Sequence, residues 1–355
     1  MIGKLNRNST LLSSIISIIL GMLVGAIAML LSGYDPISAY GALFSSVFGS
    51  ASDMGETLRT ITPLIFAGLA VALAFRTGMF NIGVEGQLVI GSLAAAFVGL
   101  KLELPPVLHA IVALVVGALA GAIWALIPGL LKAIRGVHEV IVCIMMNWIA
   151  LFLSNYMVGK VLSNNSDSTE KIHPSASIRV DFLTDMFDGA RVHLGLILAI
   201  LTTIFVYVLL FRTKLGYELR AVGLNPDASE YAGMSVKRNI ILSMMISGGI
   251  AGLAGAVELL GTSEYLAINP SLPGTGFDGI AVALLGANTP IGVVLSSMLF
   301  GGLFNGGSNM QYVAEVPFEV IRIVFAAIIL FVAANFVKQL GNRKNRKKKG
   351  EKASA

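Results

Sequence analysis

Residues 75–92 read FRTGMFNIGVEGQLVIGS and interrupt the apolar pattern of the chain between two apolar segments. The interruption holds one acid, two amides and several glycines, namely Gly78, Asn81, Gly83, Glu85, Gly86, Gln87 and Gly91. Backbone that gives up its own hydrogen bonds inside a bilayer must face protein or water. An ionisable residue at that depth is by default a candidate for a functional role. The stretch therefore predicts a broken membrane segment with a polar role.

The composition is that of an integral membrane protein. Hydrophobic residues make up 55% of the chain and charged residues 13%, whereas a soluble domain carries roughly 25% charge. The 39 glycines are typical of a helical bundle, in which small residues let helices approach closely. The single cysteine, Cys143, lies in an apolar run and supports neither a disulfide framework nor a metal site.

Ten apolar segments can be placed between residues 11 and 337, with residues 32–56 as a polar connection between the first two. The segments are 11–31, 57–75, 84–100, 107–131, 138–158, 193–211, 239–260, two short ones within 278–305, and 317–337. We therefore predict an all-α polytopic fold that forms one transmembrane domain over residues 1–355. Two of its segments, residues 78–92 and 278–305, are short or broken.

The charges predict which side of the membrane each connection occupies. The tail at residues 338–355 is strongly basic, and such tails are cytoplasmic. With ten crossings the N-terminus is cytoplasmic as well, whereas reading 278–305 as one helix would give nine and place the tail outside. The connection at residues 159–192 is predicted to lie outside. A basic tail beside a membrane also indicates an anionic lipid surface rather than nucleic acid.

A second break occurs at residues 286–290, which read GANTP, so each half of the chain carries one. A pair of broken segments in corresponding positions is the best sequence pointer to a transport site. Amides offer both a donor and an acceptor to a polar solute. The candidate pathway residues are Asn81, Glu85, Gln87, Asn147 and Asn288. The alternative is that these side chains cap and pack broken helices and never touch solute.

The polar connection at residues 212–238 has helix signals that ordinary loops lack. Residues 217–222 favour a helix ended by Gly223, and Asn225 followed by Pro226 favours the start of another. We predict a cytoplasmic coupling element with contributions from Arg220, Gly223, Asn225, Pro226, Asp227, Ala228 and Gly233. The alternative is a solvated loop with an incidental helix.

The motifs NIGVEGQ (81–87) and RAVGLNPDA (220–228), followed by SGGIAGLAGAVE (247–258) and GGLFNGG (301–307), occur in this order. Together they resemble the membrane subunits of bacterial ABC importers for nucleosides, simple sugars and branched-chain amino acids, and especially the nucleoside and sugar branch. The resemblance implies a plasma-membrane permease for nucleosides, with a fold similar to the vitamin B12 and ribose permeases. It also implies three protein partners: a second homologous permease, a cytoplasmic ABC ATPase and an extracellular solute-binding lipoprotein. We hypothesise separately that this lipoprotein docks on residues 159–192.

The chain has no Gly-x4-Gly-Lys-Ser/Thr phosphate loop, the motif that cradles ATP. We therefore expect a transport subunit rather than an enzyme, with no catalytic residue, no metal and no cofactor of its own, and with ATP on the partner ATPase. Two alternatives stay open. One is an ABC permease for a simple sugar or a branched-chain amino acid. The other is an ion-coupled secondary transporter, for which Glu85, Glu258 and Glu319 are the candidate carboxylates.

Overall fold

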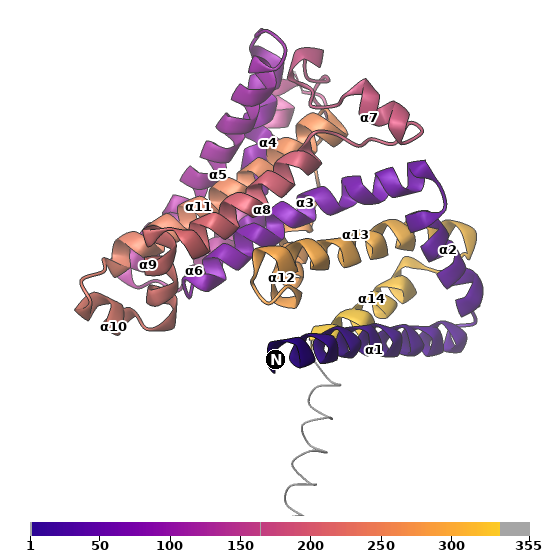
Figure 1. The fold of residues 1–355 in the computed structure, drawn as a ribbon. Coiled ribbons are helices and arrows are strands. Elements are labelled where there is room, and N and C mark those ends of the chain that lie inside the picture. The colour runs from indigo at the N-terminus through magenta and orange to yellow at the C-terminus, as the bar shows by residue number, and fades with distance from the viewer. Residues whose placement is uncertain (1, 164, 334–355) are drawn as a thin grey trace, which may run out of the picture. The chain divides into compact units, whose positions relative to one another are not determined.

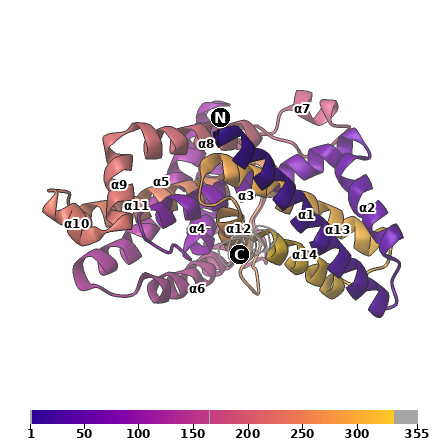
Figure 2. The ribbon, with the colours of Figure 1, turned by 60° about the horizontal axis from the view of Figure 1, so that its bottom comes forward.

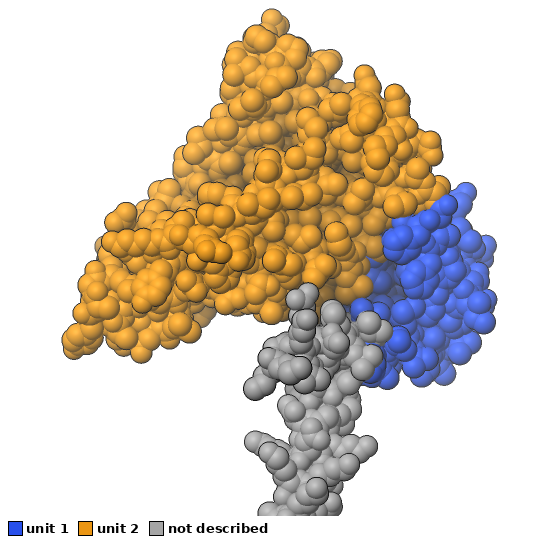
Figure 3. Space-filling view, in the orientation of Figure 1, with its two compact units in different colours: residues 1–49, 303–355 blue, residues 50–302 orange. Residues whose placement is uncertain are grey.

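The computed structural model describes residues 2–163 and 165–333, and its named elements are all helices (Figure 1). The described residues belong to two compact units, residues 1–49 with 303–355 and residues 50–302 (Figure 3). Each unit is described by itself below.

The first unit is held by close packing between the first and last described helices. It contains α1 (Ile2–Leu31), α2 (Pro36–Phe48), the last residues of α13 (Pro290–Val313) and α14 (Phe318–Ala333). Gly21 of α1 lies against the backbone of Ile328, and Gly25 lies against the side chain of Val324. Two glycines one turn apart thus let α1 and α14 approach closely, as small residues do between membrane helices.

Helix α2 was not predicted, because residues 32–56 were read as a polar connection. Asp35 caps it by accepting hydrogen bonds from the backbone N–H groups of Ile37 (3.1 Å) and Ser38 (3.0 Å), and Pro36 occupies the first helical position. An acidic cap followed by proline is a standard helix start, so the signal was present in the sequence. The amide of Asn309 on α13 donates to the Ala42 carbonyl of α2 (2.9 Å).

The second unit contains the elements that position the candidate site. They are α3 (Ala51–Arg76), α4 (Val84–Lys101), α5 (Leu108–Arg135), α6 (Glu139–Met157), α7 (Asp181–Met186), α8 (Gly195–Arg212), α9 (Lys214–Leu224), α10 (Pro226–Tyr231), α11 (Val236–Glu258), α12 (Thr275–Leu285) and the first residues of α13. Short π-helical turns, η1 (Val158–Leu162) and η3 (Leu259–Ser263), extend α6 and α11, and a 3₁₀ turn, η2, spans Pro174–Ala176. Figures 1 and 2 show α9 and α10 at the end of this unit opposite to α7.

The centre of the second unit is a crossing of α4, α5 and α11 at which glycines meet backbone to backbone. A Cβ atom added at Gly252 would collide with the carbonyl oxygen of Gly117, and one at Gly121 would collide with that of Gly248. One at Gly91 would collide with the carbonyl of Gly252 itself. The Gly-rich motif of residues 247–258 therefore serves the close approach of three helices.

The connection at residues 159–192, which is predicted to lie outside, is anchored to the segment that follows η3. Backbone hydrogen bonds of 2.8 Å run from Thr169 N–H to the Leu266 carbonyl and from Ile268 N–H to the Asp167 carbonyl. This connection is therefore an ordered cover over the end of α11 and not a free loop.

The prediction of an all-α polytopic protein is confirmed. By length and composition, seven described helices could cross a membrane, and three further apolar helical stretches are shorter. Each of the ten predicted segments overlaps a helix, respectively α1, α3, α4, α5, α6, α8, α11, α12, α13 and α14. The single permease domain and the cytoplasmic side of both termini stay predictions, and the basic tail at residues 338–355 lies outside the described residues.

The glycine crossing gives a testable prediction with a control on the same helix. Gly252→Ala should lower the stability of the folded protein by about 1–3 kcal/mol, the usual cost of overpacking a filled core, because its methyl group meets backbone that cannot rotate away. Gly249→Ala should be near neutral, since the nearest atoms to its Cβ lie at 3.6 Å. Thermal unfolding in detergent measures both variants. Equal melting temperatures for the two would contradict the proposed crossing.

Candidate functional site

The first break lies between the end of α3 at Arg76 and the start of α4 at Val84, and Asn81 stands at its centre. Asn81 is fully buried. Its amide nitrogen donates to the side-chain oxygen of Gln87 (2.9 Å) and to the hydroxyl of Ser247 on α11 (2.8 Å). Its amide oxygen accepts from the backbone N–H of Gly83 (3.0 Å). One amide therefore satisfies interrupted backbone and ties the break to α11 at the same time.

A second amide, Asn147, reaches the break from α6. Its oxygen accepts from the backbone N–H of Gly86 (2.8 Å), and its nitrogen donates to the carbonyl of Ile82 (3.1 Å). Asn147 is 1% exposed. This side chain therefore takes the place of the helical partners that the break removes, which a protein at membrane depth must supply.

Glu85 joins the first break to α12 in the second half of the chain. Its two carboxylate oxygens accept hydrogen bonds of 2.6 Å each, from the backbone N–H groups of Gly274 and Gly276. These groups lie at the N-terminus of α12, which carries the positive end of the helix dipole. A fully buried acid is thus held by two charge-assisted hydrogen bonds. The lack of a side chain on Gly276 lets Glu85 lie directly against its backbone.

The second break separates α12 from α13 and is bound by Arg76. Its Nε donates to the carbonyl of Asn288 (2.8 Å), and its Nη2 donates to the carbonyl of Ala287 (3.3 Å). Both acceptor residues have left-handed backbone, with φ of 52° at Ala287 and 51° at Asn288. Thr289 caps α13 by accepting from Gly292 N–H (3.2 Å). The break predicted at residues 286–290 is therefore present as a tight turn.

The structure brings most of the predicted pathway residues together. Asn81, Glu85, Gln87 and Asn147 form one buried polar cluster around the first break, whereas Asn288 lies at the far end of α12. The amide oxygen of Asn288 is buried without a hydrogen-bond partner among the described residues. In the other four, side-chain atoms bind groups of the chain itself, and direct solute contact stays a prediction for all five.

Sequence reasoning missed two residues of this site. Ser247 receives the hydrogen bond from Asn81 and donates its own hydrogen to the carbonyl of Ala70 (2.7 Å). Arg76 was not among the residues predicted to contribute to the site. The available signals were weak: Ser247 precedes a pair of glycines, and Arg76 opens the break.

The connection at residues 212–238 forms two short helices, as predicted, although with a different first boundary. Helix α9 begins at Lys214 after the Thr213 cap and runs through Gly223 to Leu224, so the prediction that Gly223 ends it was wrong. Gly223 instead lies against the backbone of Arg76 and Gly78, where a side chain would collide. A helix tolerates glycine at a cost of about 1 kcal/mol, and here the close approach explains it.

Helix α10 agrees with the predicted cap. The Asn225 side chain accepts from the backbone N–H of Ala228 (3.0 Å), and Pro226 occupies the first helical position. Gly233 follows the helix with φ of +81°, a conformation that favours glycine. The side chains of Leu224 and Tyr231 are 88% and 96% exposed. The connection thus presents an ordered, partly apolar surface.

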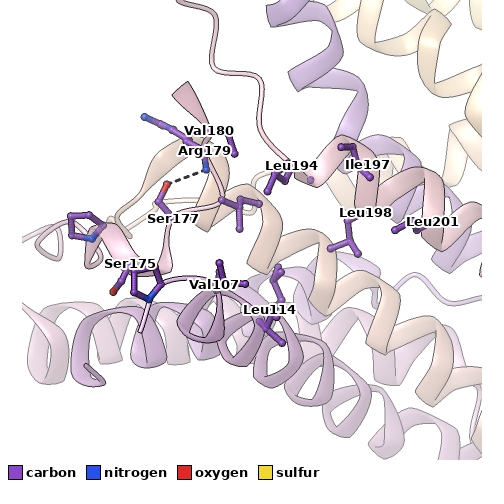
Figure 4. Close-up of a pocket in the computed structure, with 16 residues that line it drawn as sticks. Val107, Leu114, Ser175, Ser177, Arg179, Val180, Leu194, Ile197, Leu198 and Leu201 are labelled. Atoms are coloured by element: carbon purple, nitrogen blue, oxygen red, sulfur yellow. Dashed lines mark hydrogen bonds between the residues drawn. The ribbon is translucent and has the colours of Figure 1, made fainter. Parts of the chain in front are cut away.

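A cavity of about 530 Å³ lies elsewhere in the second unit, where α5 and α8 begin (Figure 4). Its polar groups are already paired within the chain: Ser177 accepts from the backbone N–H of Arg179 (3.2 Å), Ser175 bonds to His109 (2.8 Å), and Arg179 donates to the Gly261 carbonyl (2.7 Å). The rest of the lining is almost entirely apolar. This cavity does not suit a polar solute, and the breaks remain the better candidate site.

Comparison with known proteins identifies close relatives. A family model described as the permease component of a branched-chain amino acid transport system matches residues 54–333. The chain is 53% identical to the guanosine ABC transporter permease protein NupP of Bacillus subtilis over 96% of this chain and 98% of the relative. It is 40% identical to the nucleoside ABC transporter permease protein NupB of Lactococcus lactis over 98% of this chain and all of the relative.

A more distant relative comes from the same organism as the first. The guanosine ABC transporter permease protein NupQ of Bacillus subtilis is 29% identical over 74% of this chain and 84% of its own length. No solved structure matches the chain.

The buried amides give a prediction with a matched control on α6. Asn147→Leu keeps the size of the side chain but leaves the Gly86 N–H and the Ile82 carbonyl without this partner, at about 1–3 kcal/mol for each buried group. Asn155→Leu removes two similar hydrogen bonds to the Asn269 backbone in a half-exposed setting. It should cost only about 1 kcal/mol. The difference in apparent melting temperature tests this, and a larger loss for Asn155→Leu would contradict it.

Proposed function

Because the chain belongs to the family of permease components of branched-chain amino acid transport systems, we propose that it is the transmembrane subunit of an ATP-driven ABC importer for nucleosides. The family and the apolar helices make it a multi-pass protein of the plasma membrane. The observation that supports nucleosides as the solute is the 53% identity to a guanosine permease over almost the full length of both chains. The resemblance noted in the sequence has the same implication.

The proposed pathway is formed by the polar residues at the two breaks. Asn81, Gln87, Asn147 and Asn288 present amides, which suit the donors and acceptors of a ribose or a nucleobase edge. Of these, Asn288 has a buried oxygen without a partner in the described structure, so it is the amide most available to solute here. The other three would have to exchange their present hydrogen bonds for bonds to the solute as the pathway opens.

ATP hydrolysis is assigned to a separate cytoplasmic ATPase that docks on α9 and α10. The exposed Leu224 and Tyr231 provide apolar contact area for such a partner. The cap at Asn225 fixes the start of α10, so a force applied to this helix is passed on rather than absorbed by unwinding. This assignment requires residues 212–238 and both termini to be cytoplasmic.

A second permease chain and an outer solute-binding lipoprotein complete the proposed complex. Two relatives of this chain, NupP and NupQ, occur in one organism under the name of guanosine permeases, which favours a pair of related but different chains. For the lipoprotein, α7 in the outer connection offers the exposed side chains of Phe182 (71%) and Met186 (59%). We place its docking surface there.

The proposed function predicts solute uptake that depends on each partner. In proteoliposomes holding both permeases and the ATPase, labelled guanosine should accumulate only with ATP on the ATPase side and the binding lipoprotein on the other. Phe182→Ser should raise the concentration of binding protein needed for half-maximal uptake without changing ATP hydrolysis in its absence. Uptake of ribose or leucine in place of guanosine would mean that the proposed solute is wrong, while the transport mechanism would stand. Uptake without ATP would overturn the ABC mechanism.

The coupling role of α10 predicts a loss that a conservative substitution repairs. Asn225→Ala removes the side-chain cap, which costs roughly 0.5–2 kcal/mol of helix stability. It should lower ATP-dependent uptake several-fold, whereas Asn225→Asp, which can still cap, should keep most of it. Uptake and ATPase activity are measured in the same vesicles. Lower uptake with unchanged ATP hydrolysis indicates lost coupling, whereas a fall in both indicates less folded protein. Equal activity of the two variants would contradict a coupling role for the cap.

A further inference from the structure

Helix α12 is bound at both ends by two charged residues that flank the first break. It is 11 residues long. Glu85, directly after the break, binds the N-terminal N–H groups of α12, and Arg76, directly before the break, binds carbonyls just beyond its C-terminus. Nine positions apart in sequence, these residues enclose the turn at 77–83 and hold the same helix from opposite ends.

The charges of the two contacts match the ends of α12. A helix carries about half a positive charge at its N-terminus and half a negative charge at its C-terminus. The carboxylate of Glu85 lies at the first end and the guanidinium of Arg76 lies at the second. Because each makes two hydrogen bonds to backbone, both fix position and direction, as bidentate charged pairs do. Exchanging the two charges would make both contacts repulsive.

The same turn is in backbone contact with α9. Gly223 of α9 lies against the backbone of Arg76 and Gly78 so closely that a methyl group would collide. Because no side chain lies between them to yield, a displacement of α9 toward the turn acts directly on the backbone of the turn. A continuous physical connection thus runs from α9 through the turn at 77–83 to α12, with Arg76 belonging to both contacts.

We propose that Arg76 and Glu85 are positioning residues that clamp α12 to the turn at 77–83, so that α12 moves together with α9. The ATPase as the source of that movement rests on the function proposed above, whereas the clamp itself does not. Asn288, whose carbonyl Arg76 holds, moves with the clamp. The clamp therefore couples a cytoplasmic helix to the second break of the pathway.

Single substitutions should release the clamp. In Glu85→Gln one acceptor oxygen becomes an NH₂ group that faces a backbone N–H, and two donors cannot bond to each other. Arg76→Ala leaves two carbonyls without their donors. Arg76→Lys keeps the charge but loses the planar pair of donors, so it should give an intermediate effect. Arg76→Lys also preserves the test if Arg76→Ala does not fold.

The test is hydrogen–deuterium exchange on the assembled transporter in nanodiscs, without nucleotide and with ATP trapped by vanadate. In the parent protein, the amides of residues 77–83 and 274–288 should change their exchange rates together. In Arg76→Ala and Glu85→Gln, residues 274–288 should exchange about tenfold faster without nucleotide and no longer respond to it. Residues 77–83 should still respond. Controls are Arg135→Ala and Glu103→Gln, which change exposed charges near the ends of α5 and α4 and should behave as the parent.

Function is measured on the same samples. Solute uptake per ATP hydrolysed should fall about tenfold in either variant. A factor of this size corresponds to a typical coupling free energy between two sites. The double variant should lose no more of this ratio than either single variant, because the effects of substituting residues that act as one unit do not add. A residue needed only for folding would lower uptake and hydrolysis together and leave their ratio unchanged.

Three outcomes would overturn the clamp: an α12 that responds to nucleotide in both variants, an α12 that does not respond in the parent, or additive losses in the double variant. Failure of the parent to transport nucleosides is a different result. In that case the exchange rates of residues 77–83 and 274–288 in the parent can still change together with nucleotide, and change separately only in the variants. The clamp then stands, and the proposed solute is wrong.

Discussion

The structure depends on one constraint, which is that backbone polar groups at membrane depth must find partners inside the protein. Two interruptions, at residues 77–83 and 286–289, release such groups. At the first, Asn81 and Asn147 supply the missing partners. At the second, Arg76 does so. Asn147 comes from α6 and Arg76 from α3, and Asn81, inside the first break, also binds Ser247 on α11. Satisfying the breaks therefore also fixes how α3, α4, α6, α11 and α12 pack around them.

Polar groups in this protein thus serve structure first. A buried amide that binds backbone in this structure has the same donors and acceptors to offer in another state. The same side chains can therefore hold the present arrangement and, in the proposed function, face a solute later. The exchange is favourable only if each lost bond is replaced, since an unpaired buried group costs about 1–3 kcal/mol. The pathway proposed above, if built from these residues, would therefore select solutes rich in donors and acceptors, such as nucleosides or sugars, over apolar ones.

The fold was predictable to the extent that hydropathy and turn chemistry determine it. All ten apolar segments correspond to helices, and Asn225 and Pro226 start α10 as their residue types predict. The failures concern interactions between segments far apart in sequence. Nothing local shows that Glu85 would meet Gly274 and Gly276, or that Gly223 would contact a turn nearly 150 residues earlier instead of ending its helix. Helix α2 was missed for another reason, because hydropathy outweighed a clear Asp35–Pro36 start signal.

The crossing of α4, α5 and α11 has a consequence for how this protein can change shape. Most cores absorb motion by rotamer changes, in which side chains slide past one another while the main chain stays in place. At Gly91, Gly121 and Gly252 there is no side chain to rearrange. Relative displacement of these helices along their axes would drive main chain into main chain, whereas a change of crossing angle about the contact would not. A change of shape would therefore turn these helices about the glycine crossing as about a pivot, with the longest movements at the helix ends.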